Sequence, residues 1–182
     1  MSRLLDKHIR NPKLHELVEW LVALFIAAVV FLIIRQFLFR TVKIVGISME
    51  PAFCHDERLI VSKTPYYFSD PDRGDVIAFP YKEEPAQKYI KRIVGLPGDE
   101  IDLIDNQFTV NSIPVDGDSV TAVGNMDFPI TVPDGAYFVL GDNRNASKDS
   151  RYYDVGFVPK KDIIGKAVFR FWPLDKIGAI GL

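Results

Sequence analysis

Few side chains in this sequence could carry hydrolytic chemistry. The chain has three histidines and one cysteine. His8 and His15 precede a long apolar segment, so only His55 could serve a serine beyond that segment, and a Ser-His-Asp triad has little support. A catalytic zinc site normally takes three protein ligands, more than Cys54 and His55 provide. If the chain is a hydrolase, we expect its general base to be a lysine or a carboxylate.

The dipeptide Cys54-His55 has two interpretations. It could supply a thiol nucleophile and its base, but adjacent side chains of an extended chain point to opposite sides. The pattern therefore favours a buried cysteine beside a solvated histidine.

Lys91 is the lysine with the most informative position. Period-two alternation along residues 89–94, YIKRIV, places Lys91 on one face of a strand and Arg92 on the other, both among apolar neighbours. Taken alone, this pattern favours two partly wet faces with both cations in water. The alternative is a desolvated Lys91, whose pKa would fall by up to about 3–5 units. Its neutral amine could then activate a serine nucleophile.

An apolar segment near the N-terminus predicts a membrane anchor. Residues 17–39 form a 23-residue segment that contains an unbroken apolar run of 15 residues, from Trp20 to Ile34. As a helix the segment would be about 34 Å long, enough to cross a hydrocarbon core of about 30 Å. A buried core helix is disfavoured because the rest of the chain is too short to enclose it. A cleaved signal peptide is disfavoured because no small-residue cleavage site follows.

Beyond residue 40 the sequence predicts β structure. Short segments rich in Val, Ile, Phe and Tyr alternate with turn signals, such as Asn111-Ser112 and the sequence LPGD at residues 96–99. We expect a mostly β domain, a coiled antiparallel sheet or barrel-like, behind a single N-terminal transmembrane α-helix. The expected strands are residues 42–47, 59–62, 76–79, 89–94, 100–104, 108–110, 137–140 and 164–171.

Charge distribution suggests how these parts are arranged across a membrane. The 182 residues carry a net charge of −2 and the pI is near 5.9, which gives no basic surface for nucleic acid. Residues 1–40 carry net +3 and residues 41–182 net −5, which mildly favours a cytoplasmic N-terminus. We expect a short cytoplasmic segment at 1–16, a transmembrane anchor at 17–39 and an extracytoplasmic β-rich domain at 40–182.

Four sequence blocks follow the anchor in order: GISMEP at 46–51, RGDVIAF at 73–79, YIKRIVGLPGDEI at 89–101 and GDNRNASKDSR at 141–151. Together they resemble the bacterial type I signal peptidases, or leader peptidases, over residues 19–173. The resemblance implies a Ser-Lys dyad serine endopeptidase that cleaves signal peptides from exported preproteins through an acyl-enzyme. It also implies a single-pass protein of the cytoplasmic (inner) membrane with a periplasmic catalytic domain. We expect a monomer in the lipid bilayer, with no metal, nucleotide or nucleic acid.

By this resemblance Ser48 is the nucleophile and Lys91 the general base. Ser147 would hydrogen-bond to the lysine and orient it. Asp149 and Arg151 would form a charged pair that supports this arrangement.

Two positions depart from patterns that are frequent in this family. Gly46 stands where some members have a serine whose hydroxyl helps to bind the oxyanion. The oxyanion hole would then rest on backbone donors, chiefly the N–H of Ser48, with Gly46 beside it. Phe53 stands where leucine is frequent, and it could serve an apolar membrane-facing surface or pack in the core.

Two other functions stay open at this point. A Ser-Lys protease of related fold could perform another task, such as self-cleavage of a repressor-type protein or processing in conjugation. A membrane-tethered β module without activity could bind leader peptides or a partner. The anchor and the block at 141–151 argue against the self-cleaving type, and the joint presence of all five site residues argues against lost activity.

Overall fold

The N-terminal part of the chain is one long helix. The structure is a computed structural model that describes residues 12–115 and 120–180, and the chain divides after Phe39 into two compact units. Helix α2 (Pro12–Leu38) has 27 residues. Its first residue is a proline, which suits the first helical turn, and residues 13–38 contain neither Gly nor Pro. His8 and most of the predicted cytoplasmic segment 1–16 lie outside the described residues.

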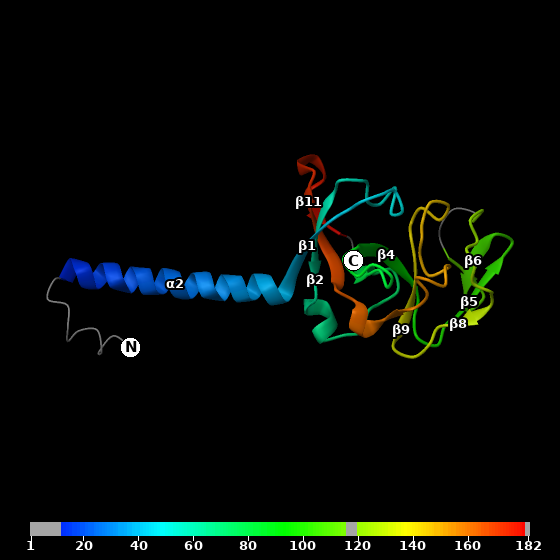
Figure 1. Cartoon of the computed structure of the whole chain (residues 1–182), viewed down its shortest axis with the longest axis horizontal. Coiled ribbons are helices and arrows are strands. Elements are labelled where there is room, and N and C mark those ends of the chain that lie inside the picture. Colours follow the sequence, from blue (N-terminus) through cyan, green and yellow to red (C-terminus); the bar gives the residue numbers. More distant parts are fainter. Residues whose placement is uncertain (1–11, 116–119, 181–182) are drawn as a thin grey trace. The chain divides into compact units, whose positions relative to one another are not determined.

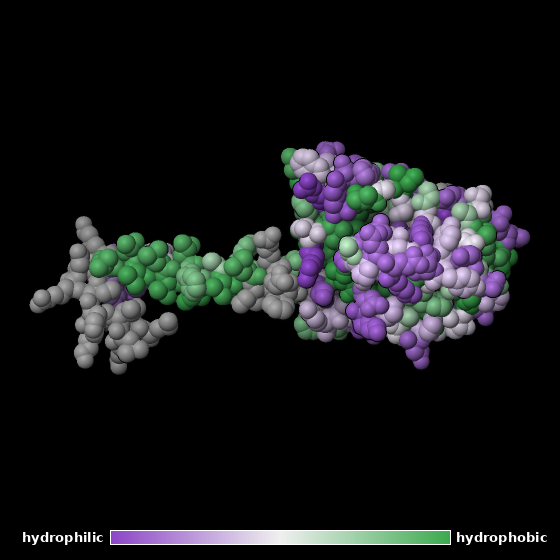
Figure 2. All heavy atoms as spheres, in the orientation of Figure 1, coloured by the Kyte–Doolittle hydropathy of each residue, from purple (hydrophilic) through white to green (hydrophobic). Residues whose placement is uncertain are grey.

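Helix α2, labelled in Figure 1, is apolar along most of its length (Figure 2). Its segment Leu14–Leu32 has a mean hydropathy of 2.0 over 19 residues, with none of its window buried. By length and composition this segment could cross a membrane.

The second unit is built from antiparallel strands in two sheets. The larger sheet has the order β1-β2-β11-β3-β4-β9-β10, with β12 paired to β11. Strand β4 is an interior strand, between β3 and β9, so neighbours fix its register on both edges. The strands of this sheet are β1 (Phe39–Lys43), β2 (Arg58–Ser62), β3 (Val76–Pro80), β4 (Lys88–Gly95), β9 (Ala136–Leu140), β10 (Val158–Pro159), β11 (Gly165–Trp172) and β12 (Gly178–Ala179).

The smaller sheet has four strands in the order β7-β6-β5-β8. The predicted turn at Asn111-Ser112 joins β6 to β7, and both residues have positive φ, 51° and 65°, as a type I′ hairpin requires. The predicted LPGD turn is closed by a hydrogen bond from Asp99 N to Leu96 O. The strands are β5 (Glu100–Ile104), β6 (Gln107–Val110), β7 (Ile113–Pro114) and β8 (Ile130–Thr131), and the 3₁₀ helices of this unit are η1 (Thr64–Tyr67), η2 (Lys160–Asp162) and η3 (Leu174–Lys176).

Buried apolar side chains form three clusters, and strand β4 contributes to all of them. Ile90 packs in the first cluster, Ile93 in the second and Val94 in the third. Because apolar side chains on both faces of β4 are buried, Lys91 lies in a packed interior rather than at a wet surface.

The predicted fold class is confirmed: antiparallel β structure follows one N-terminal apolar helix. The predicted strand at 42–47 was misplaced, because β1 ends at Lys43 and the chain then turns at Gly46, whose φ is +94°. Strands β7, β8, β10 and β12 were not among the expected strands. Each has two residues, too few for a period-two pattern to emerge.

Candidate active site

Ser48 lies in a turn that follows strand β1. The turn is closed by a hydrogen bond from Glu50 N to Ile47 O, and Phe53 N donates to Met49 O. Met49 is 1% exposed, so its side chain anchors the turn in the first apolar cluster. Ser48 itself is partly exposed, as a residue that meets substrate must be.

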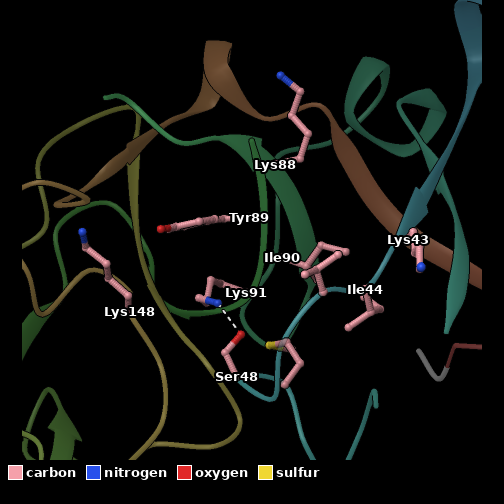
Figure 3. A pocket seen from close by; sticks show the side chains of 10 residues that line it. Lys43, Ile44, Ser48, Lys88, Tyr89, Ile90, Lys91 and Lys148 are labelled. Carbon is pink, nitrogen blue, oxygen red and sulfur yellow. Dashed lines mark hydrogen bonds between the residues drawn. The ribbon is translucent and has the colours of Figure 1, made fainter. Parts of the chain in front are cut away.

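Lys91 reaches Ser48 from strand β4. Its Nζ donates a hydrogen bond to Ser48 Oγ at 2.6 Å (Figure 3). Lys91 is 4% exposed, and burial lowers its pKa to about 8, although the nearby carboxylates of Asp149 and Asp142 act in the opposite direction. The wet position favoured by the alternation pattern alone was therefore wrong for Lys91. Its amine is within reach of deprotonation near neutral pH.

A cavity of about 150 Å³ opens beside this pair. Figure 3 shows Ser48 and Lys91 at its wall, with Lys43, Lys88 and Lys148 around them. The ring of Tyr89 lies under the amine, 5.3 Å from its centroid to Lys91 Nζ. The cavity is lined by Lys43, Ile44, Val45, Ser48, Met49, Lys88, Tyr89, Ile90, Lys91 and Lys148. A serine hydroxyl bonded to a desolvated amine, at the wall of an open cavity, is the arrangement of a Ser-Lys hydrolase.

Asp149 and Arg151 form a buried ion pair. Both side chains are 0% exposed, and two hydrogen bonds of 2.7 and 2.9 Å join the guanidinium to the carboxylate. Asp149 also accepts a hydrogen bond from Gly141 N at 3.0 Å, and Arg151 donates to Ser147 O at 3.0 Å. The pair therefore ties together both ends of the loop from Gly141 to Arg151.

Ser147 lies close to Ser48, but it does not bond to Lys91. Its side chain is buried, and Ser147 Oγ has no hydrogen-bond partner among residues 12–115 and 120–180. Gly141 separates the two serines: a Cβ on Gly141 would overlap with both Ser147 Oγ and Ser48 O. The orienting bond from Ser147 to Lys91 stays a prediction.

The backbone near Gly46 is held by His55. Gly46 N donates to His55 Nδ1 at 3.0 Å, His55 Nε2 lies 3.2 Å from Asp56 Oδ1, and Asp56 pairs with Lys43 at 2.8 Å. Because the amide of Gly46 is already bonded, the N–H of Ser48 is the better candidate for the oxyanion donor.

Sequence reasoning did not assign roles to Gly141 and His55. Gly141 is the first residue of the block at 141–151. A glycine in such a block was a signal in the sequence, because glycine is often required where the backbone approaches another segment closely. The hydrogen bond between Gly46 and His55 joins residues nine positions apart, so no local sequence pattern indicates it. Cys54 is partly exposed, not buried as expected. Phe53 is 4% exposed in the first cluster, so it packs in the core.

No group of three or more His, Cys, Asp or Glu side chains that could hold a metal ion lies within the described part of the chain.

Comparisons with known proteins point to one family. A sequence model of the family described as "Signal peptidase, peptidase S26" matches residues 17–172. A signal peptidase I from Bacillus licheniformis is 38% identical over 176 residues, which are 91% of this chain and 94% of that protein. A signal peptidase I from Leptolyngbya laminosa is 36% identical over 173 residues, 91% of this chain and 84% of that protein. A crystal structure of a signal peptidase I from Enterococcus faecalis V583 is 34% identical, with a TM-score of 0.43, and covers 54% of this chain and 97% of that one.

The chain therefore belongs to the signal peptidase family, peptidase S26. It is a serine endopeptidase of the signal peptidase I type, whose reaction is the cleavage of signal peptides from preproteins. The family and the N-terminal apolar helix together fit a membrane-anchored protein.

Proposed function

We propose that this chain removes signal peptides with Ser48 as nucleophile and Lys91 as general base. The observation that carries this proposal is the 2.6 Å hydrogen bond between Lys91 Nζ and Ser48 Oγ, made by an amine whose pKa burial lowers to about 8. A neutral amine at this distance can accept the hydroxyl proton.

The reaction proceeds in two halves. Lys91 takes the proton of Ser48 Oγ, which attacks the scissile carbonyl, and the Ser48 N–H stabilises the oxyanion. Protonated Lys91 then gives the proton to the leaving amine, and an acyl-enzyme remains on Ser48. In the second half Lys91 takes a proton from a water molecule, and the water oxygen attacks the ester carbonyl. As the ester bond breaks, protonated Lys91 returns the proton to Ser48 Oγ and the signal peptide leaves. No step requires a metal or a nucleotide.

Three further residues position this pair. Asp149 and Arg151 hold the loop that packs against the Ser48 turn, since Gly141 N bonds to Asp149 and Asn143 N donates to Ser48 O at 3.1 Å. Ser147 Oγ is a buried hydroxyl without a partner among the described residues, which supports its turning toward Lys91 when the amine is protonated and needs an acceptor.

The protein works as a single-pass protein of the cytoplasmic membrane. Residues 1–16 are cytoplasmic, 17–39 cross the bilayer and 40–182 form the catalytic domain on the extracytoplasmic side, in line with net charges of +3 and −5 on residues 1–40 and 41–182. Its partners are exported preproteins and the lipid bilayer. Because one chain supplies both Ser48 and Lys91, a monomer suffices.

Cleavage of a purified preprotein tests the proposed chemistry. The full chain in detergent should release a mature protein with one new N-terminus, read by mass spectrometry. Ser48→Ala should release none while it still unfolds at the wild-type temperature. Cleavage by folded Ser48→Ala would show that the nucleophile is elsewhere, and binding of the preprotein by wild type without turnover would favour a tethered binding module.

The single cysteine provides a test of orientation. Cys54 is partly exposed and is the only cysteine in the sequence, so a maleimide that cannot cross membranes should label it on intact spheroplasts. A Cys54→Ala chain with a cysteine at Ser2 is the matched control, and it should label only after lysis. The reverse pattern would contradict the proposed topology.

A further inference from the structure

A stack of two tyrosine rings lies beside the proposed general base. Tyr89 and Lys91 are two residues apart on strand β4, so their side chains point to the same face, and both line the cavity beside Ser48 (Figure 3). The ring of Tyr89 stacks on the ring of Tyr81, with centroids 4.8 Å apart and planes 12° from parallel. The amine is therefore in contact with an aromatic pair that has no role in the mechanism described above.

The pairing of β3 with β4 explains this stack. Tyr81 follows β3 directly, and its N–H donates to Gln87 O at 3.0 Å, which extends the β3–β4 pairing by one step. Tyr89 is two residues beyond Gln87, so it is the diagonal neighbour of Tyr81, a position within reach of aromatic side chains. Phe79 lies directly opposite Tyr89 and meets its ring edge-on, with centroids 6.1 Å apart. Two aromatic neighbours thus hold the ring of Tyr89.

The hydroxyl of Tyr81 is held by three charged side chains. Its proton faces Asp154 Oδ2 at 2.6 Å and Glu83 Oε2 at 2.8 Å. Its oxygen accepts a hydrogen bond of 2.8 Å from Lys148 Nζ, and Lys148 also pairs with Asp154. Lys148 Nζ lies 4.8 Å from the centroid of the Tyr81 ring. Because Tyr81 is 7% exposed and its hydroxyl is bonded on several sides, its ring is a fixed support for Tyr89.

The contact between Tyr89 and Lys91 favours the protonated amine. The face of an aromatic ring attracts a cation that lies within about 6 Å of its centroid, most strongly where water is excluded. Lys91 Nζ lies at 5.3 Å and the side chain is 4% exposed. The ring therefore acts against the desolvation that lowers the pKa of Lys91, as Asp149 and Asp142 do, whereas Arg151 lowers this pKa further.

Both phenols stay neutral near neutral pH. The hydrogen bond to Asp154 raises the pKa of Tyr81 to about 12, and burial raises the pKa of Tyr89. The charged groups around Tyr89 are Lys148, which lowers this pKa, and three that raise it, Asp154, Glu83 and Glu84. The stack therefore presents an uncharged ring to Lys91, and a shift in a pH profile that follows a change in the stack reports on the amine.

We propose that Tyr81 is a positioning residue for the cleavage reaction. Tyr81 holds the ring of Tyr89 against Lys91 Nζ, so that the amine keeps its place beside Ser48 in both protonation states. Tyr81 does not line the cavity beside Ser48, so it acts through Tyr89. This inference rests on the proposed role of Lys91 as general base, and it links that base to the loop between β9 and β10.

The pH profile of kcat/KM for preprotein cleavage tests the contact with the ring. Tyr89→Phe keeps the ring face, so its midpoint should stay at the wild-type value. Tyr89→Leu removes the ring and should move the midpoint to lower pH by about 0.4–1 units, because the protonated amine loses an attraction. Equal midpoints in the two variants would overturn the proposal.

Variants of Tyr81 test its action through Tyr89. Tyr81→Leu removes the stacking partner and should move the midpoint in the same direction as Tyr89→Leu. It should also lower kcat about two- to tenfold, the equivalent of one aromatic pair, with an unchanged KM because Tyr81 does not line the cavity. In a chain that already carries Tyr89→Leu, Tyr81→Leu should move the midpoint no further, because the ring it supports is gone. Additive shifts would overturn the proposal.

Tyr66→Phe is the matched control for Tyr81→Phe. Both tyrosines belong to the second apolar cluster, and each hydroxyl is bonded to a carboxylate, that of Tyr66 to Asp75 Oδ2 at 2.8 Å. Tyr81→Phe should lower kcat about two- to tenfold, the equivalent of one hydrogen bond, whereas Tyr66→Phe should leave kcat unchanged. Equal effects would reject the positioning role. This pair of variants decides the question if Tyr81→Leu does not unfold cooperatively.

Lys91→Met, measured in the same assay, separates this inference from the proposed function. If Lys91→Met is inactive while the profiles of Tyr89→Phe and Tyr89→Leu coincide, the stack has no positioning role and the proposed catalysis stands. If Lys91→Met cleaves at the wild-type rate, both proposals are wrong.

Discussion

Lys91 and Arg92 are consecutive residues of strand β4 whose cationic groups meet opposite surroundings. Lys91 Nζ donates to a neutral hydroxyl at 2.6 Å, and burial lowers its pKa to about 8. Arg92 makes two hydrogen bonds to the carboxylate of Asp142, at 2.8 and 2.7 Å, and this carboxylate raises the pKa of Arg92. The two residues point to opposite faces of the same strand.

The difference shows how one strand can serve both chemistry and structure. Desolvation disfavours any cation, and a bonded carboxylate offsets that cost. Lys91 has no ion-pair partner among the described residues, so its amine can lose its proton and act as a base. Arg92 keeps its charge and ties β4 to the loop that begins at Gly141. The face with the unpaired cation is where the chemistry is expected.

The largest expected effect separates these two residues by activity. Lys91→Met should reduce kcat/KM for a preprotein on the order of 10⁴-fold or more. The general base and the nucleophile act together, so removing the base alone removes most of the catalysis. Arg92→Lys keeps a cation beside Asp142 and should cost less than about tenfold. Steady-state cleavage assays decide this. Activity in Lys91→Met, or an equal loss of kcat/KM in both variants, would contradict the division between a catalytic Lys91 and a structural Arg92.

The buried ion pair should behave as a structural element with a large cost when broken. Asp149→Asn leaves the guanidinium of Arg151 buried without its counter-charge and should lower the free energy of unfolding by about 3–5 kcal/mol. Asp70→Asn is the control, because Asp70 pairs with Lys160 at the surface. The side chain of Asp70 is 79% exposed and that of Lys160 43% exposed, so loss of this pair should lower the free energy of unfolding by at most about 1 kcal/mol. Chemical unfolding of both variants measures the difference, and equal costs would contradict it.

The unpaired cation should have the opposite effect on stability. The pKa of Lys91 is about 8 in the folded chain against an ordinary lysine value of 10.5, so between these pH values the unfolded chain holds a proton that the folded chain has released. Unfolding free energy therefore rises with pH across this window. Below pH 8 the protonated amine destabilises the fold by about 3 kcal/mol.

Removing this amine should remove that part of the pH dependence. Lys91→Met should be more stable than wild type at pH 7, with an advantage that shrinks between about pH 8 and 10.5. Unfolding titrations of both proteins over this range give the comparison. A constant difference across the range would mean that the amine is not desolvated.

The smallest expected effect concerns the backbone beside the nucleophile. His55→Phe removes the acceptor for Gly46 N and should lower kcat/KM about two- to tenfold, the equivalent of one hydrogen bond worth about 0.5–1.5 kcal/mol. His55→Gln offers an amide oxygen in its place and should recover part of the loss. No change in His55→Phe, or no recovery in His55→Gln, would reject a positioning role.

Much of this arrangement could be predicted from the sequence, and the exceptions share a physical cause. Strand β4 and the turn at Asn111-Ser112 follow from alternation and turn chemistry, which are local. The burial of Lys91 depends on how β3 and β9 pack beside β4. The alternation pattern contains no information on that packing, and by itself it predicted a solvated Lys91. The hydrogen bond between His55 and Gly46 likewise depends on how the chain folds back after β1.

Resemblance supplied what local patterns could not. Ser48, Lys91, Asp149 and Arg151 were named from sequence blocks that lie far apart in the chain, and the structure places Ser48 against Lys91 and Asp149 against Arg151. The hydrogen bond expected from Ser147 is absent from the described contacts.

The pH dependence of kcat/KM tests the central claim most directly, namely that unprotonated Lys91 activates Ser48. In the free enzyme, kcat/KM should rise with pH and level off, with a midpoint near the Lys91 pKa of about 8. Asp142→Asn removes a carboxylate that raises this pKa, so its midpoint should move to lower pH. A profile that is flat from pH 6 to 9, or a midpoint that Asp142→Asn leaves unmoved, would contradict the account.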